Sequence, residues 1–254
     1  MHILVTNDDG VQAPGLLVLV QEMRRLGDVT VLAPDRNWSA SGHVKTMERP
    51  MRVREVTLAD GTSALTSDGA PSDCVALALL GVVKKKIDLV VSGINPNANI
   101  GHDVTYSGTV TAAMEAVIAG VPGVAVSLDS TPGQSELDYG PAGRVAARVV
   151  KRALAEGLPS GVLLNLNVPG IAEKDIKGLL VTRQGLRVYR DALDARTDPR
   201  GRPYYWIGGE YPTGVDEAGT DFGALKAGYI SVTPLQLDLT ARVALKVLSE
   251  WDWA

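Results

Sequence analysis

The chain has 254 residues, 45% hydrophobic and 21% charged, a balance that predicts a folded protein and excludes a disordered one. The formal net charge is −4 and the longest basic run is Lys84 to Lys86, so the electrostatic footprint of a protein that binds long nucleic acid is missing. A single cysteine, Cys74, excludes an intrachain disulfide, and no apolar stretch reaches the length of a membrane span. We therefore expect a cytoplasmic protein with no signal peptide and no membrane partner.

Five short apolar runs are predicted as strands, at residues 3–6, 29–34, 88–94, 123–128 and 162–169. The first four are mostly continuous, which is typical of strands covered on both faces. Apolar residues at helical spacing predict helices between them, at residues 14–27, 108–120 and 142–157. This alternation predicts an α/β fold with a doubly wound, mainly parallel, Rossmann-like sheet.

Two stretches depart from that alternation. Residues 44–67 alternate apolar and polar side chains around an Asp60-Gly61 turn, which indicates an antiparallel excursion. After Gly170 the chain becomes rich in aromatics and arginine, with predicted short strands in 179–193, 202–209 and 228–235. We expect residues 1–170 to form a Rossmann-like core, and residues 171–254 to form a hairpin and helix extension.

The last segment, residues 238–254, is predicted as a helix with Asp238 as its N-cap. Its apolar stripe must be covered by other residues; the stripe consists of Leu239, Val243, Val247 and Trp251. Either the helix packs back on its own domain, or it docks with the preceding hairpins on a partner subunit.

Polar side chains follow three of the predicted strands at the point where each ends. Asp8 and Asp9 follow the first strand, Ser39 follows the second, and Asn95 follows the third. Because ligands bind at the carboxyl ends of strands in an open parallel sheet, we expect these side chains to converge. Two carboxylates, a hydroxyl and an amide oxygen suit Mg²⁺, Mn²⁺ or Ca²⁺, whereas zinc prefers the histidine and cysteine that are scarce here.

Each of these residues also has an ordinary structural interpretation. Asp8 and Asp9 are placed to cap the helix that follows, Ser39 lies in a polar loop, and Asn95 precedes a proline as turn residues do. Capping of one helix does not explain the other two loops, so their joint placement favours a metal site.

A phosphate site is predicted beside the metal site, where Ser107, Gly108 and Thr109 open a helix. Free backbone N–H groups and the positive end of the helix dipole attract an anion there, although an ordinary Ser/Thr cap has the same sequence. The lysine and the spacing of a triphosphate-binding P-loop are absent, so a single phosphate group is predicted. Asn99 is placed to orient a metal ligand or a phosphate oxygen, and His102 or His43 to donate a proton.

Four motifs follow one another along the chain: "TNDDG" (6–10), "PDRNWSASG" (34–42), "SGIN" (92–95) and "DVTYSGTV" (103–110). With these motifs, and with "DGAPSDCV", "DPRGRPYYWIGG" and "GYISVTPLQLDLT", the chain resembles the SurE family of metal-dependent nucleoside monophosphate phosphatases. This resemblance implies that Asp8, Asp9, Ser39 and Asn95 sit where the family's metal ligands sit, and that the C-terminal extension builds a homodimer or homotetramer. Trp38, beside the metal-loop serine, is placed to stack on a base, with Asn37 next to it.

We therefore predict a 5′/3′-nucleotidase, a phosphoric monoester hydrolase that uses one Mg²⁺ or Mn²⁺ per subunit and releases phosphate from nucleoside monophosphates. Residues 1–170 are the predicted catalytic core, which binds metal and phosphate, and residues 171–254 are the predicted extension for oligomerisation. Asp8, Asp9 and Asn95 are the predicted catalytic residues, and either water or an aspartate is the nucleophile. The alternative is a non-catalytic nucleotide- or phosphate-binding regulatory module. A receiver-type signalling domain fits less well, because Asn95 stands where its phospho-accepting aspartate is required.

Overall fold

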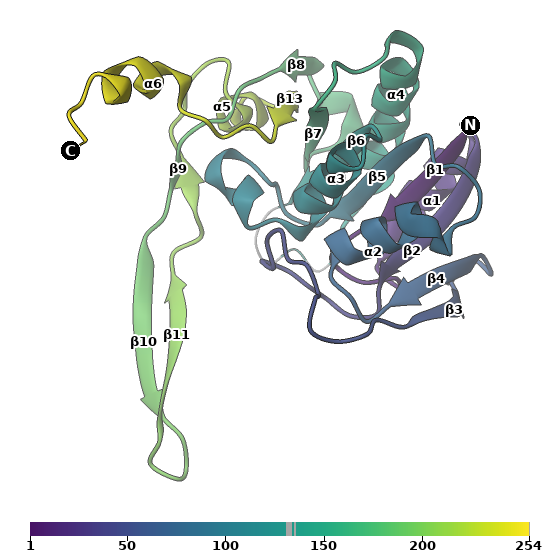
Figure 1. Ribbon diagram of the computed structural model, residues 1–254, viewed down its shortest axis with the longest axis horizontal. Helices are drawn as coiled ribbons and strands as arrows, with labels where there is room; N and C mark the ends of the chain where they lie inside the picture. The colour runs from purple at the N-terminus through teal and green to yellow at the C-terminus, as the bar shows by residue number, and fades with distance from the viewer. Residues whose placement is uncertain (131–133, 135, 254) are drawn as a thin grey trace.

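A nine-stranded sheet forms the centre of the computed structural model, which describes residues 1–130, 134 and 136–253 (Figure 1). The strand order is β3-β4-β2-β1-β5-β6-β7-β13-β8. The strands are β1 (His2–Thr6), β2 (Asp28–Pro34), β3 (Val53–Thr57), β4 (Ser63–Ser67), β5 (Leu89–Asn95), β6 (Gly123–Asp129), β7 (Val162–Pro169), β8 (Leu179–Val181), β9 (Arg187–Val188), β10 (Asp191–Thr197), β11 (Pro203–Gly209), β12 (Thr213–Gly214) and β13 (Ile230–Gln236). The helices are α1 (Pro14–Arg24), α2 (Pro71–Leu77), α3 (Gly108–Ile118), α4 (Gly140–Glu156), α5 (Asp221–Lys226) and α6 (Arg242–Ser249), with short turns η1 (Ala78–Val82), η2 (Gly101–Thr105) and η3 (Glu173–Asp175).

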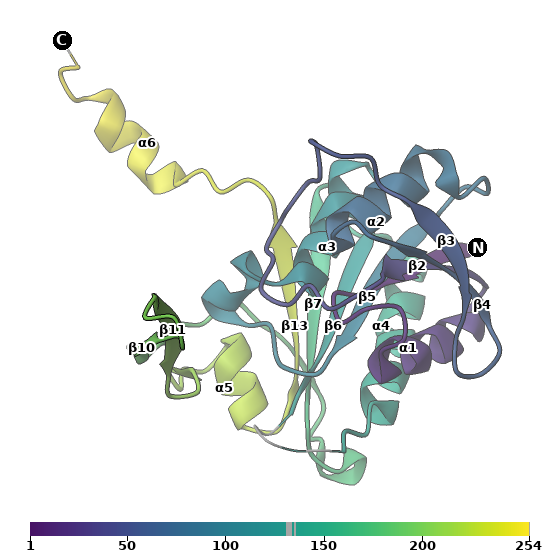
Figure 2. The same ribbon diagram turned by 90° about the horizontal axis from the view of Figure 1, so that it is seen from below.

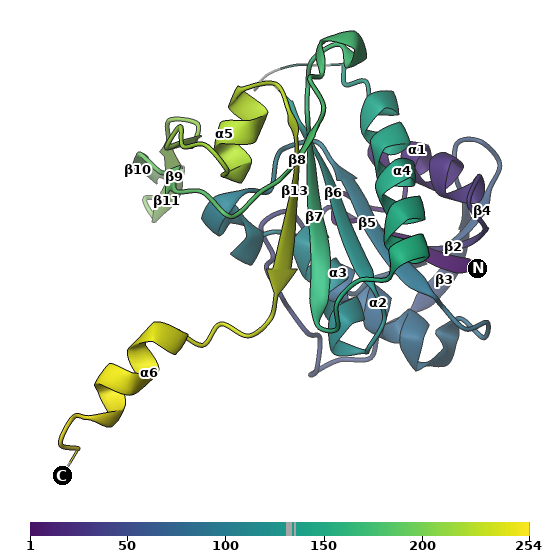
Figure 3. The same ribbon diagram turned by 90° about the horizontal axis from the view of Figure 1, so that it is seen from above.

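The predicted α/β sheet is confirmed. β1 pairs in parallel with β2 and β5, and β6 pairs in parallel with β5 and β7. Helices α1 and α4 cover one face, and α2 and α3 cover the other (Figure 3). Alternate residues of β1 enter opposite cores, with Ile3 and Val5 on the α1 and α4 side and Leu4 on the α2 and α3 side. Burial on both faces is the reason that these strands have continuous apolar sequences.

The hairpin predicted around Asp60-Gly61 is present as antiparallel β3 and β4. It is more closely joined to the sheet than an excursion, because β4 also pairs in parallel with β2 and so extends the edge of the sheet. Cys74 lies fully buried on α2, as expected of a packing residue, and burial raises the pKa of its thiol well above the usual value.

The region after Gly170 is divided between the sheet and two projections. β13 pairs antiparallel with β7, and β8 pairs in parallel with β13, so both belong to the central sheet. In contrast, β10 and β11 form a separate hairpin that extends away from the sheet (Figure 1).

The final helix differs from its prediction in start and in packing. α6 begins at Arg242 with Ala241 as N-cap, because the Asp238 carboxylate accepts a bond from the backbone N–H of Thr240 (3.0 Å) and does not cap the helix. No residue of α6 is buried, and the helix projects from the sheet (Figure 2), so packing on its own domain is wrong. Of the helices that the structure describes, none combines the length and apolarity required to traverse a bilayer.

Candidate functional site

Three neighbouring strands bring the predicted ligands together. β2, β1 and β5 are adjacent, and their carboxyl ends deliver the loops that carry Ser39, Asp8 and Asn95. These three side chains and Ser107 line one cavity of about 280 Å³. The structure therefore brings three of the four predicted ligands to one cavity, whereas Asp9, the neighbour of Asp8, is not among the residues that line it.

Asp8 is buried against the start of α3. Its side chain is 3% exposed, and the Thr109 hydroxyl donates a hydrogen bond to Oδ1. Burial raises the pKa of Asp8, while Thr109 and the backbone N–H groups of Gly108 and Thr109 act in the opposite direction. A Cβ added to Gly108 would lie 2.7 Å from the Asp8 Cβ, so only glycine allows the helix to begin this close to the carboxylate.

The alternative that the two acids cap the following helix is wrong. α1 begins at Pro14 with Ala13 as its N-cap, and the cap makes no side-chain bond. The first turn of α1 holds no acidic residue, because Asp9 lies four residues before the N-cap and Asp8 lies five residues before it.

The Asp9 carboxylate forms no ion pair with any residue that the structure describes. Its Oδ2 is buried and has no hydrogen-bond partner among the described residues. Burial raises the pKa of Asp9 to about 7, and repulsion by Asp8 adds to the shift. An unpartnered carboxylate oxygen beside a second buried acid is the environment that a divalent cation stabilises, so the residues fit a metal ion.

The neutral ligands complete an all-oxygen set. The Asn95 amide donates from Nδ2 to the carbonyl of Asn97 (2.5 Å), which leaves its own Oδ1 available. The Asn37 Oδ1 accepts from the backbone N–H of Ser39 (2.6 Å) and so shapes the loop that presents the hydroxyl. No three His, Cys, Asp or Glu side chains gather into a metal cluster in the described part of the chain. A cation here would depend on these neutral oxygens, which favours Mg²⁺ or Mn²⁺ over zinc.

The start of α3, predicted to hold phosphate, is partly engaged within the protein. The Ser107 Oγ caps the helix by accepting from the backbone N–H of Val110 (3.1 Å). The Thr109 hydroxyl and the first backbone N–H groups face Asp8, as described above. Ser107 lines the cavity, whereas Gly108 and Thr109 lie behind Asp8.

Of the other residues predicted for the site, Asn99 lines the cavity, whereas the two histidines and Trp38 do not. Asn99 reaches the cavity wall, but its Nδ2 donates to Ser127 Oγ (2.8 Å), so the side chain anchors the loop. His102 is exposed and outside the cavity lining, and His43 pairs with Glu115 (3.0 Å). The Trp38 ring is also outside the lining, with the Arg36 guanidinium 4.8 Å from its centroid.

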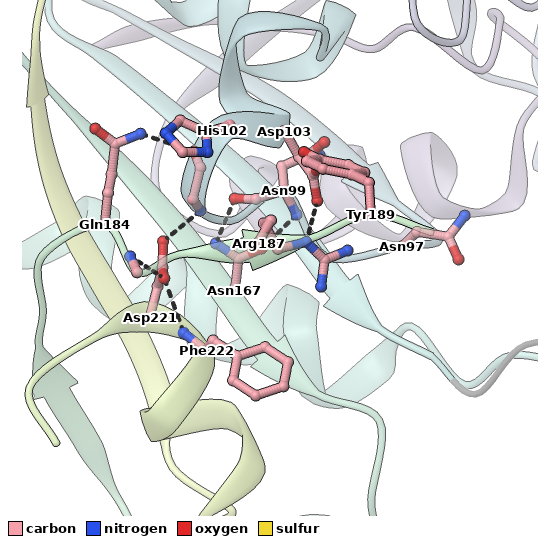
Figure 4. A network of polar contacts seen from close by, with 12 residues as sticks. Asn97, Asn99, His102, Asp103, Asn167, Gln184, Arg187, Tyr189, Asp221 and Phe222 are labelled. Atoms are coloured by element: carbon pink, nitrogen blue, oxygen red, sulfur yellow. Dashed lines mark hydrogen bonds and ion pairs between the residues drawn. The ribbon is translucent and has the colours of Figure 1, made fainter. Parts of the chain in front are cut away.

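The lining also includes four charged or aromatic residues that the sequence did not predict for the site: Asp103, Tyr106, Arg187 and Tyr211. Arg187 comes from β9, beyond the predicted catalytic core, and Nε donates to Asp103 Oδ2 (2.7 Å) (Figure 4). The sequence indicated this region through its many arginine and aromatic residues after Gly170. It could not predict which residue of that region reaches the site.

Fold and site define a Rossmann-like α/β protein with paired acids at the carboxyl edge of its sheet. The profile of the family "Survival protein SurE" matches residues 3–191. The chain is 52% identical to the 5′-nucleotidase SurE of Chloroflexus aggregans over all of both chains, and 47% identical to that of Geobacter sulfurreducens over 99% of this chain and 94% of the relative. The crystal structure of the Sure protein from Aquifex aeolicus superposes with a TM-score of 0.82 at 40% identity, covering 98% of each chain. The chain belongs to the SurE family.

Proposed function

We propose that the chain is a divalent-metal-dependent phosphatase that hydrolyses nucleoside monophosphates to nucleoside and phosphate. The observation that carries the proposal is the buried, unpartnered Asp9 oxygen beside Asp8, at the sheet edge where three loops converge. The relatives named 5′-nucleotidase SurE support the nucleotide as substrate. We extend the proposal to nucleoside 3′-monophosphates, as the resemblance to the SurE family implies.

Asp8, Asp9, Ser39 and Asn95 would hold one Mg²⁺ or Mn²⁺ per subunit. The bound ion would supply positive charge to the phosphoryl oxygens and lower the pKa of a water. Thr109 fixes the Asp8 carboxylate, and Asn37 fixes the Ser39 loop, so both ligands are oriented before substrate enters. Ser107 presents its hydroxyl to the cavity as a donor for a phosphate oxygen.

The test is phosphate release by purified protein from a panel of nucleoside 5′- and 3′-monophosphates, with Mn²⁺ or Mg²⁺ and after treatment with EDTA. We expect turnover that EDTA abolishes and added metal restores. Nucleotide binding without phosphate release would instead identify a binding module. Turnover that EDTA leaves unchanged would contradict the proposed metal site but not the proposed phosphatase activity.

We also propose that the chain forms a homodimer or homotetramer in the cytoplasm. Val243 of α6 is 91% exposed, Leu239 just before the helix is 88% exposed, and Ile207 of the β10–β11 hairpin is 84% exposed. Apolar side chains on two projecting elements are typical of surfaces that subunits bury against one another.

A further inference from the structure

Arg187 is held in a fixed position at the wall of the cavity. Its side chain is 7% exposed, and Nε donates to Asp103 Oδ2 at 2.7 Å. The Tyr189 hydroxyl donates to the other oxygen of the same carboxylate, so Arg187 and Tyr189 converge on Asp103 (Figure 4). The stem of Arg187 crosses Gly101, where an added Cβ would lie 2.8 Å from the arginine Cγ. The guanidinium is therefore anchored at one nitrogen and supported along its stem.

The rest of the guanidinium is free to bind a ligand. Neither Nη group has a hydrogen-bond partner among the residues that the structure describes. Asp129, at the end of β6, acts on Arg187 electrostatically, but no hydrogen bond joins the two. Two N–H-bearing nitrogens in a fixed plane match the oxygens of a phosphoryl group.

The charges that line the cavity favour a cationic side chain as the partner of a phosphate group. Asp8 and Asp103 both contribute carboxylates to the lining, and Arg187 is the one cationic side chain among the described lining residues. The backbone N–H groups that open α3 already face Asp8. A phosphate dianion entering the cavity therefore meets acidic side chains, and one divalent cation shared with two carboxylates leaves its charge incompletely balanced.

We propose that Arg187 binds the phosphoryl group of the substrate, and that Asp103 and Tyr189 are positioning residues that aim its free Nη groups at that group. This inference rests on the proposed phosphatase function. It assigns part of the substrate site to the region after Gly170, which the sequence had indicated only as an oligomerisation extension.

The experiment compares wild type with Arg187→Met, which keeps the apolar stem and removes the charge. The substrates are a nucleoside 5′-monophosphate and p-nitrophenyl phosphate, which has no base, and the probe for binding is competitive inhibition by inorganic phosphate. We expect KM for both substrates and the inhibition constant of phosphate to rise about 10- to 100-fold, as for loss of charge-assisted hydrogen bonds. The Kd of Mn²⁺ should stay unchanged.

The matched control is Arg190→Met, because Arg190 lies three residues further on with an exposed side chain that pairs with Glu210 at 3.4 Å outside the cavity. We expect wild-type constants from it. Tyr189→Phe should raise KM less than Arg187→Met and leave kcat unchanged, as expected for a residue that acts through Asp103. Thermal unfolding checks each variant, and if Arg187→Met does not fold, Arg187→Lys retains the charge beside Asp103 but not the planar fork and should still raise KM.

Three outcomes separate the two proposals. Wild-type protein that releases no phosphate overturns the proposed function itself. Active wild type with unchanged KM and phosphate inhibition in Arg187→Met and Arg187→Lys overturns the role of Arg187 alone. A rise in KM confined to the nucleotide, with p-nitrophenyl phosphate unaffected, would show that Arg187 contacts the nucleoside and would also overturn the phosphoryl assignment.

Discussion

Asp8 and Asp9 are adjacent, but their surroundings give them different tasks. Asp8 accepts a hydrogen bond from the Thr109 hydroxyl and is oriented by the start of α3. In contrast, the buried Oδ2 of Asp9 has no hydrogen-bond partner in the described part of the chain. Orientation of one ligand by neighbouring hydrogen bonds is the usual arrangement at metal sites. The second ligand depends on the ion itself for its stabilisation.

Asp8→Asn keeps the shape of the side chain and removes one of the two formal charges of the proposed ligand set. We expect the Kd of Mn²⁺ to rise by at least about tenfold and turnover to fall with it. Loss of a group that only hydrogen-bonds a metal ligand already weakens metal affinity by about that factor. Asn95→Ala should weaken binding less, because a neutral ligand is lost. Calorimetric titration with Mn²⁺ and phosphate release measure the two effects.

The control for Asp8→Asn is Asp28→Asn, at the start of β2 and so at the opposite edge of the sheet. Its side chain is 69% exposed and pairs with Lys85, so metal binding should match wild type. Wild-type turnover in Asp8→Asn would remove Asp8 from the proposed site.

The Asp9 carboxyl makes the stability of metal-free protein depend on pH. Its pKa is about 7 in the folded chain against an ordinary 3.8, so the charged form opposes folding. This opposition is absent below the ordinary pKa and complete above the raised one. In EDTA, the free energy of unfolding of wild type should therefore fall relative to Asp9→Asn as pH rises from about 4 to about 7.5. The difference should reach a few kcal/mol, at about 1.4 kcal/mol for each pKa unit.

Urea denaturation of both proteins across this pH range measures the difference. Mn²⁺ added at the upper end should stabilise wild type and have little effect on Asp9→Asn, which reverses the order of the two proteins. Parallel stability curves in EDTA would show that Asp9 is not the group strained by burial.

At the level of elements, the loop between β5 and α3 is fixed by buried polar side chains from distant parts of the chain. The Asn99 backbone N–H donates to Asn167 Oδ1 (2.8 Å), and the Asn165 amide donates to the carbonyl of Asn99 (2.8 Å). Further along, the Gly101 N–H donates to Asp221 Oδ2 (2.8 Å) (Figure 4). Asn95 and Asp103 are therefore positioned by β7 and α5 as well as by their own loop.

Asp221→Asn tests this connection. Asp221 is fully buried and accepts from the backbone N–H groups of Gly101 and Gly185, each at 2.8 Å. An amide nitrogen in place of one oxygen would oppose donor to donor, so we expect a loss of about 1–3 kcal/mol in the free energy of unfolding. Turnover should fall as well, because the loop carries Asn95. Asp216→Asn, at an exposed carboxylate that pairs with Lys226, is the control and should leave both unchanged.

The sequence was sufficient to predict the strands of the central sheet and the loops at their ends, but not the contacts of the region after Gly170. Continuous apolar runs define β1, β2 and β5, and the rule for open parallel sheets then places Asp8, Ser39 and Asn95 together. Arg187 lies on a two-residue strand whose place depends on Gly101 and Asp103, more than 80 residues earlier. No local pattern carries such a contact. The start of α6 was missed for the opposite reason, because local bonds of Asp238 replaced the expected cap.

For the whole molecule, apolar surface is concentrated on elements that leave the sheet. Val247 of α6 and Trp251 just after the helix are each 55% exposed, and on the hairpin Leu193 and Trp206 are 69% and 62% exposed. Figures 1 and 2 show that the two elements project separately. Two separate apolar surfaces allow a dimer through one of them and a tetramer through both.

Deletion of residues from 238 onward removes one of these surfaces and leaves the sheet intact, because β13 ends at Gln236 and no residue of α6 is buried. We expect the truncated protein to form smaller assemblies than the full chain, measured by size-exclusion chromatography with light scattering. Val243→Asp should act like the deletion, since Val243 is 91% exposed within one chain and a charge there harms only an interface. Ser249→Asp places the same charge on another face of the helix as a control. An unchanged mass in both the deletion and Val243→Asp would assign the assembly to the hairpin or to no surface at all.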